Sequence, residues 1–238
     1  MIRTGVWFLF FWIYLLGTLP KLVLVNKRKD AGEIADQIAR KWSGNLLRLA
    51  GADVEVVGEA NVPLDQSVVF VSNHQSNFDI PLMIAKVPGT KGFVAKVETL
   101  KIPIVRTWMR HMKCVFIDRT DIRQQVRTII EGVQNIKSGQ SMVVFPEGTR
   151  SPDGSLGEFK AGSLKLATKS GASVVPVAII NSRGLMPKGA WKIKPAKVKM
   201  IIGTPIEISE THVKETVALS NLVKERIQEA FEKYETIN

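Results

Sequence analysis

The segment that most constrains the fold begins at Asp53, where short runs rich in β-branched residues alternate with segments of helical periodicity. Strands are predicted over residues 54–57, 68–71, 92–95, 114–117, 142–145, 174–179 and 197–202. Helices are predicted between them over residues 80–86, 122–136 and 163–168. This order is typical of an α/β fold, so we expect a mixed, mainly parallel sheet covered by helices.

The N-terminal segment is unusually apolar. Residues 6–19 read VWFLFFWIYLLGTL and carry no charge. A helix that spans a bilayer needs about 20 apolar residues, a length reached here only by continuing across Pro20 and Lys21. A secretory signal fits poorly, because no small-residue cleavage site follows. Three amphipathic aromatics are expected at the level of the lipid headgroups: Trp7, Trp12 and Tyr14.

The residues that follow suggest how this segment meets a membrane. Lys27, Arg28 and Lys29 would each gain about 1 kcal/mol beside anionic headgroups. Residues 31–50 have the apolar spacing of a helix. We therefore predict that residues 1–50 form a membrane-docking helix pair that dips into one leaflet, although a single span or a core hairpin would also fit. Residues 51–238 would form the α/β domain. The expected location is the cytoplasmic membrane, with monotopic attachment and the site facing the cytoplasm.

The charge balance predicts an anionic partner. The chain has 33 Lys and Arg residues against 22 Asp and Glu, a net charge of +11. Nucleic acid, anionic lipid and a phosphorylated substrate are the three possible partners. Nucleic acid is disfavoured because no recognisable binding motif occurs. Residues 183–199 contain six cations and no acid, so we expect them to contact an anionic membrane surface, with a solvated basic loop as the alternative.

The strongest candidate for catalysis is a histidine and an aspartate beside one predicted strand. His74 follows residues 68–71, and Asp79 falls on the first turn of the next helix, with Ser76 or Asn77 as its cap. A carboxylate on Nδ1 fixes the histidine tautomer and leaves Nε2 to act as a base. Ser76 also allows a serine nucleophile, but it does not lie in a G-x-S-x-G turn.

Cations recur after other predicted strands. Lys96 follows residues 92–95, and Arg119 follows residues 114–117. Arg150 ends a third segment, in which Gly148 permits a tight turn and Thr149 adds a hydroxyl. An arginine at a strand end can hold a phosphate with two hydrogen bonds. The pattern predicts a phosphate-binding site near His74, while any single arginine could also be a surface ion-pair partner.

Four blocks, in this order along the chain, form a pattern that is far more specific than the histidine and aspartate alone. They are Asn73-His74-Gln75-Ser76-Asn77-Phe78-Asp79, Phe116-Ile117-Asp118-Arg119, Phe145-Pro146-Glu147-Gly148-Thr149-Arg150-Ser151 and Val175-Pro176-Val177-Ala178-Ile179. Together they resemble the blocks of the glycerolipid acyltransferase family, most closely the bacterial lysophosphatidic acid acyltransferase type. The resemblance covers residues 50 to 205.

The resemblance implies transfer of an acyl chain from acyl carrier protein or acyl-CoA to the sn-2 hydroxyl of lysophosphatidic acid, which gives phosphatidic acid. His74 would be the base and Asp79 would orient it. Arg119 would bind the acceptor phosphate with help from Lys96, and Glu147, Gly148, Thr149 and Arg150 would shape the acceptor site. Neither a cofactor nor a metal is expected. Acylation of another lysophospholipid or of glycerol 3-phosphate, and lipid hydrolysis, are the alternatives.

Overall fold

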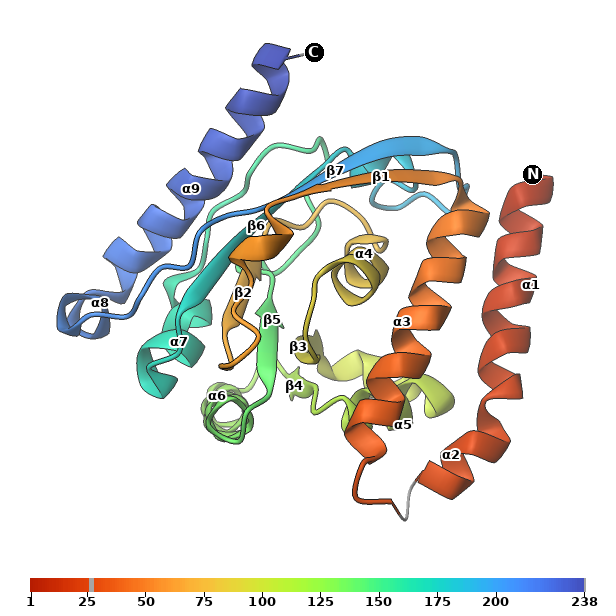
Figure 1. Ribbon diagram of the computed structural model, residues 1–238, viewed down its shortest axis with the longest axis horizontal. Coiled ribbons are helices and arrows are strands. Elements are labelled where there is room, and N and C mark those ends of the chain that lie inside the picture. The colour runs from red at the N-terminus through yellow and green to blue at the C-terminus, as the bar shows by residue number, and fades with distance from the viewer. Residues whose placement is uncertain (26–27, 238) are drawn as a thin grey trace.

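The computed structural model describes residues 1–25 and 28–237, with side chains as far as Lys233. Its centre is a seven-stranded sheet in the order β1-β7-β6-β2-β5-β3-β4 (Figure 1). The strands are β1 (Ala52–Val57), β2 (Val69–Ser72), β3 (Lys91–Lys96), β4 (Val115–Ile117), β5 (Ser141–Val144), β6 (Val174–Ile180) and β7 (Ala196–Ile202). Neighbouring strands are parallel except for β6 and β7. The predicted mixed, mainly parallel sheet is confirmed.

The strand directions decide where loops can meet. β2, β3, β4, β5 and β6 run in one direction, whereas β1 and β7 run in the other. The carboxyl ends of the first five strands therefore share one edge of the sheet. Such an edge is where α/β proteins place their ligand sites.

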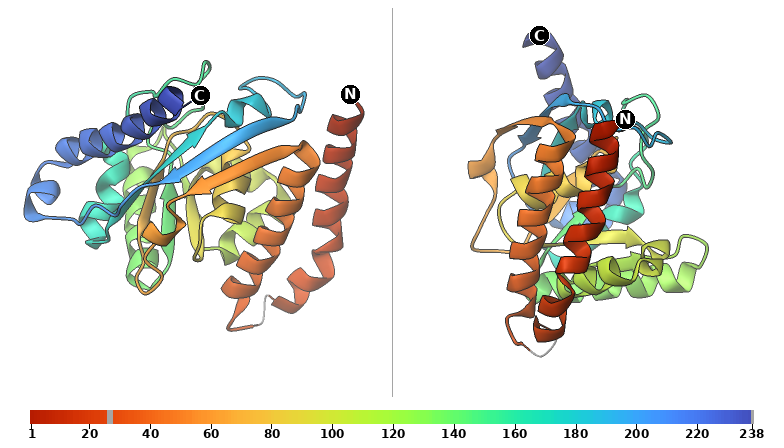
Figure 2. Two further views of the ribbon diagram at one scale, coloured as in Figure 1. Left: turned by 45° about the horizontal axis from the view of Figure 1, so that its top comes forward. Right: turned by 90° about the vertical axis from the view of Figure 1, so that its right-hand side faces the viewer.

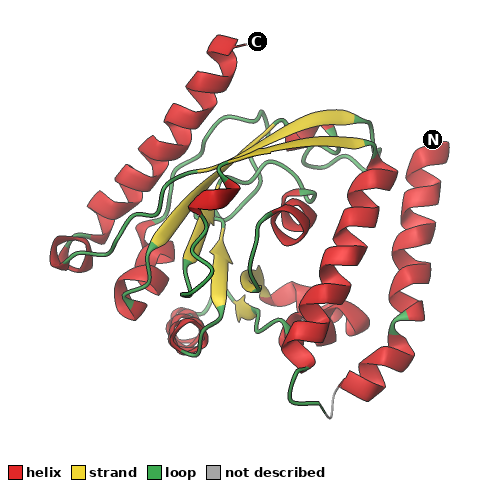
Figure 3. Ribbon diagram, in the orientation of Figure 1, coloured by secondary structure: helices red, strands yellow, loops and turns green. Residues whose placement is uncertain are grey.

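Helices cover both faces of the sheet (Figures 1 and 3). They are α4 (Asp79–Lys86), α5 (Pro103–His111), α6 (Ile122–Lys137), α7 (Lys165–Ser170), α8 (Glu210–Lys214) and α9 (Thr216–Ile237). Short 3-10 turns are η1 (Glu59–Asn61), η2 (Val97–Lys101), η3 (Ala161–Leu164) and η4 (Ser182–Gly184). Because side chains alternate along a strand, Phe70 packs with α4 on one face while Val69 and Val71 join α6, α7 and α9 on the other.

Three helices precede the sheet, namely α1 (Ile2–Gly17), α2 (Leu19–Val25) and α3 (Ala31–Ala50). α1 lies beside α3 (Figures 1 and 2). Trp7 is buried between them, and its indole donates to the Leu46 carbonyl at 2.9 Å. Its predicted position at the headgroup level is therefore wrong, because the ring also packs against Phe78 of the α/β domain. Trp12, by contrast, is half exposed.

The outer face of α1 is apolar and exposed. It consists of Ile2, Val6, Leu9, Ile13 and Leu16, spaced so that they follow one side of the helix. By length and composition, Ile2–Val25 could cross a membrane. Of the basic residues after it, Arg28 pairs with Asp30 at 2.6 Å, and Lys27 lies outside the described residues. The domain boundary at residue 50 stays a prediction.

A buried polar clasp joins α3 to the sheet. Lys91 at the start of β3 is 1% exposed and donates to the carbonyls of Val87 and Gly89 at 2.8 and 2.7 Å. Arg40 of α3 donates to the same two carbonyls and pairs with Asp36. Burial, aided by the charge of Arg40, lowers the pKa of Lys91 to about 7. The N-terminal helices are thus attached to the α/β domain by polar as well as apolar contacts.

Candidate active site

His74 and Asp79 meet directly at the carboxyl end of β2. His74 Nδ1 lies 2.7 Å from Asp79 Oδ2, and the same oxygen accepts the backbone N–H groups of Gln75 at 2.7 Å and Ser76 at 2.8 Å. The Asp79 side chain is fully buried, while that of His74 is 16% exposed. Phe145 stacks on the imidazole with ring centroids 4.3 Å apart. Asp79 therefore holds the loop closed and orients the ring, so that Nε2 points away from the carboxylate.

The other oxygen of Asp79 accepts a hydrogen bond from Ser182 Oγ. Ser182 begins η4, two residues after the last residue of β6, and it is fully buried. Sequence reasoning missed this residue, because a single serine after a strand carries no signal of its own. The parallel direction of β6 and β2 is what brings it to the same edge as His74. Ser182 is accordingly a positioning residue for Asp79.

We expect Ser182→Ala to lower the free energy of unfolding by about 1–3 kcal/mol, because a buried carboxylate oxygen loses its hydroxyl partner. Urea denaturation of the purified protein measures this change. Ser155→Ala is the control, since its hydroxyl binds Asp153 in an exposed turn. Equal stability of the two variants would contradict the assigned contact.

Glu147 braces the backbone of the histidine loop. Its Oε1 accepts the His74 N–H at 2.8 Å, and its Oε2 accepts the Gly157 N–H at 3.2 Å. The Ser151 N–H donates to the His74 carbonyl at 2.7 Å, which joins the same two loops. Burial raises the pKa of Glu147, and the two backbone donors oppose that effect. Glu147 thus acts on His74 by holding its backbone rather than through a hydrogen bond to the imidazole ring.

Arg119 lies beside the loop that follows β5. Its Nη1 donates to the carbonyl of Gly148. Gly148 has a φ of +71°, a conformation that favours glycine, and a Cβ there would lie 2.7 Å from Arg119 Nη1 and displace the guanidinium. Lys96 and Thr149 are exposed and Arg150 is half-buried at the same edge. Within the described part of the chain, no hydrogen bond links these three side chains to His74 or Asp79.

Ser76 has a structural role. Its hydroxyl donates to the Met186 carbonyl at 2.8 Å and accepts the Phe78 N–H at 3.2 Å, and the residue is fully buried. The alternative of a serine nucleophile is wrong, because the hydroxyl is already engaged away from the imidazole. The predicted helix cap is also wrong: α4 begins at Asp79, and the residue before it, Phe78, supplies no side-chain cap.

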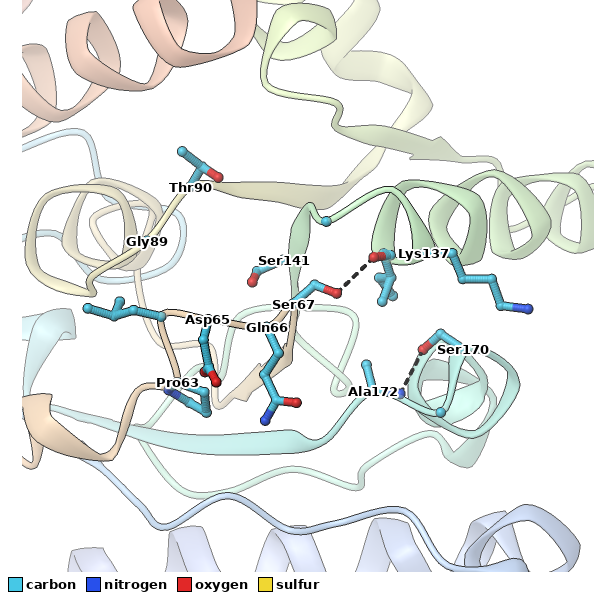
Figure 4. Close-up of a pocket in the computed structure, with 14 residues that line it drawn as sticks. Pro63, Asp65, Gln66, Ser67, Gly89, Thr90, Lys137, Ser141, Ser170 and Ala172 are labelled. Carbon is cyan, nitrogen blue, oxygen red and sulfur yellow. Dashed lines mark hydrogen bonds between the residues drawn. The ribbon is translucent and has the colours of Figure 1, made fainter.

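A cavity of about 470 Å³ opens at the other edge of the sheet, near the amino ends of β2 and β5 (Figure 4). Asp65 and Lys137 are its charged lining residues. The Ser67 hydroxyl donates to the Ile136 carbonyl at 2.8 Å in its wall. Because the cavity is on the side opposite His74, it is separate from the candidate active site.

Comparison with known proteins identifies the family. The family model described as Acyltransferase matches residues 53–180. A probable 1-acyl-sn-glycerol-3-phosphate acyltransferase of Mycoplasma pneumoniae is 33% identical over 79% of this chain and 75% of its own length. A chloroplastic 1-acyl-sn-glycerol-3-phosphate acyltransferase of Arabidopsis thaliana is 36% identical over 75% of this chain, which spans 49% of that longer protein.

A solved structure agrees with these matches. The crystal structure of the 1-acyl-sn-glycerophosphate acyltransferase from Thermotoga maritima superposes with a TM-score of 0.84 at 33% identity. The match covers 98% of this chain and 95% of the other, so it includes the N-terminal helices as well as the sheet. The chain is a member of the acyltransferase family.

Proposed function

We propose that this enzyme transfers an acyl chain from a thioester donor to the sn-2 hydroxyl of 1-acylglycerol 3-phosphate, which gives phosphatidic acid. The observation that carries the proposal is the contact between His74 and Asp79 at an edge where cations gather. The relatives from Mycoplasma and Arabidopsis and the Thermotoga structure bear names of this activity. Hydrolysis through a serine nucleophile is disfavoured because the Ser76 hydroxyl is hydrogen-bonded to Met186 and Phe78.

In the proposed mechanism, His74 acts directly on the acceptor. Its Nε2 takes the proton of the sn-2 hydroxyl while that oxygen attacks the thioester carbonyl carbon. The buried Asp79 carboxylate stabilises the imidazolium that forms. The tetrahedral intermediate then collapses, the carbon–sulfur bond breaks, and the imidazolium returns its proton to the thiolate. Ester and thiol are the products, and the side chains end in their starting states.

The proposed site for the acceptor phosphate lies around Arg119, with Lys96 and Arg150 as further cations. Arg119 uses one nitrogen for the Gly148 carbonyl, and its remaining N–H groups can donate to phosphate oxygens. That contact would fix the direction in which the guanidinium points. Thr149, which is exposed, would add a hydroxyl to the acceptor site.

The proposed donor is acyl carrier protein or acyl-CoA, each of which presents a thioester with a good leaving group. The proposed location is the cytoplasmic membrane, with the active site on the cytoplasmic side. The apolar outer face of α1 supports attachment within one leaflet, because the inner face, through Trp7, already packs against the protein. The acceptor would then reach the site from the leaflet itself.

We expect Arg119→Gln to raise the KM for 1-acylglycerol 3-phosphate about 10- to 100-fold, because a charge-assisted hydrogen bond to phosphate is worth about 1.5–3 kcal/mol. Labelled acyl transfer in detergent measures it, with monoacylglycerol as the acceptor that lacks phosphate. Arg123→Gln, at an exposed arginine four residues further along the chain, is the control. A fall in rate that is equal for both acceptors would refute the role of Arg119 in binding phosphate.

A further inference from the structure

A second hollow lies next to the active site, at the crossover between β6 and β7. Its volume is about 420 Å³. It is lined by Asn181, Arg183, Gly184, Pro187, Ala190, Lys192 and Lys194. Three of these residues are cations and none is an acid. Since β6 ends at the same edge as β2, the hollow opens beside the loops that carry His74 and Ser182.

The positive charge of the hollow is not neutralised by the protein. Among the described residues, Arg183, Lys192 and Lys194 form no ion pair. Arg183 Nη2 donates to the Pro152 carbonyl at 3.3 Å, and its Nε is buried without a hydrogen-bond partner. A buried donor without a partner is costly, and the other N–H groups of Arg183, which lines the hollow, can donate to an anion there. The chemistry of the hollow therefore favours a phosphate group.

Ile193, which lies between Lys192 and Lys194, points inward, so the two lysines point outward. Ile193 is 4% exposed, and its N–H donates to Thr4 Oγ1 on α1 at 3.1 Å. The Lys194 N–H donates to the Leu185 carbonyl at 3.0 Å. This alternation leaves both lysine side chains exposed at the rim of the hollow.

The surroundings of the hollow indicate which phosphate it meets. Trp191, between the lining residues Ala190 and Lys192, is 59% exposed, and Ile2 on the first turn of α1 is 86% exposed. The hydrogen bond from Ile193 to Thr4 places this loop beside that end of α1 (Figure 2). An exposed tryptophan beside lysines and an exposed apolar helix face is typical of a surface at the lipid headgroup level.

We propose that the hollow binds the phosphate of an anionic phospholipid headgroup. Binding there would hold the loop between β6 and β7 at the bilayer surface. Arg183 follows Ser182 in the chain, and Ser182 donates to Asp79, so a bound headgroup would also restrain the active-site carboxylate. The inference concerns a second lipid, distinct from the acceptor that Arg119 binds, and it does not depend on the identity of that acceptor.

The test uses the full-length protein and a double variant, Lys192→Gln with Lys194→Gln. Both side chains are exposed, so folding should be unaffected. We expect binding to vesicles that contain phosphatidylglycerol to fall about 10- to 30-fold in flotation assays, since each cation contributes about a factor of five. Binding to vesicles of phosphatidylcholine alone should not change. The matched control, Lys165→Gln with Lys169→Gln on α7, removes the same charge from exposed positions.

Three outcomes would overturn the proposal. An equal loss in the α7 variant would mean that net charge, rather than the hollow, attracts the vesicle. An equal loss on phosphatidylcholine would mean that the variant disturbs the apolar face of α1. A raised KM for acyl-CoA in detergent would assign the hollow to the phosphates of the donor. A loss of binding seen only with anionic vesicles, and only in the Lys192→Gln with Lys194→Gln variant, would support the proposal.

Discussion

We expect His74→Ala to lower kcat for acyl transfer about 10³-fold or more, because the acceptor hydroxyl loses its only proposed base. The protein should still fold. The His74 side chain contacts Asp79 and Phe145, while the loop itself is held by backbone hydrogen bonds to Glu147 and from Ser151, which alanine retains. Formation of labelled phosphatidic acid by the purified variant measures the loss.

The control replaces a histidine that has no proposed part in the chemistry. His212 lies in the capping box of α8 and is half-buried there, so His212→Ala should leave kcat unchanged. Circular dichroism of both variants establishes that each is folded. A His74→Ala enzyme that keeps a tenth of the wild-type rate would exclude His74 as the base.

Much of this site could be predicted because parallel strands bring the residues at their carboxyl ends together. Sequence periodicity located all seven strands, and parallel strands place their carboxyl ends at one edge. His74, Arg119 and Glu147 follow three of those ends, and Lys96 is the last residue of a fourth strand, β3. The contact between His74 and Asp79 is local, since they are five positions apart in the sequence, so a tight turn suffices to form it.

The contacts that could not be predicted are long-range. Ser182 reaches Asp79 across 103 residues, and Glu147 reaches the His74 N–H across 73. Neither residue type signals such a partner, because serine and glutamate are frequent in loops. The position of Trp7 differs from the one that the sequence predicts for a similar reason. Its apolar neighbours suit a membrane, but packing against Phe78 and a hydrogen bond to Leu46 decide its position.

These long-range contacts give the site its rigidity. Asp79 receives hydrogen bonds from the loop after β2 and from Ser182 after β6, and Glu147 ties the loop after β5 to the same histidine. The imidazole is thus fixed by three loops that the sheet holds in register. A base held in this way needs no rearrangement before it accepts a proton.

We expect Asp79→Asn to lower kcat about 10²- to 10⁴-fold in a protein that remains folded. Four donors point at this carboxylate: His74 Nδ1–H, the N–H groups of Gln75 and Ser76, and the Ser182 hydroxyl. If the amide oxygen faces the first three, the Ser182 hydroxyl can turn to accept from the NH₂ group. The histidine then keeps its tautomer but loses the negative charge that stabilises the imidazolium. In the other orientation the NH₂ group faces Nδ1, which places the proton on Nε2 and removes the base.

The measurement is kcat for acyl transfer to 1-acylglycerol 3-phosphate, with urea denaturation to establish that the variant is folded. Asp65→Asn is the matched control, because that carboxylate lines the cavity at the opposite edge of the sheet and should not affect the rate. A folded Asp79→Asn enzyme with the wild-type kcat would show that the carboxylate only stabilises the loop and has no part in the reaction. A large loss in the folded variant, with no loss in Asp65→Asn, would place Asp79 in the reaction, through its negative charge or through the tautomer that it imposes on His74, since the amide preserves the shape of the side chain.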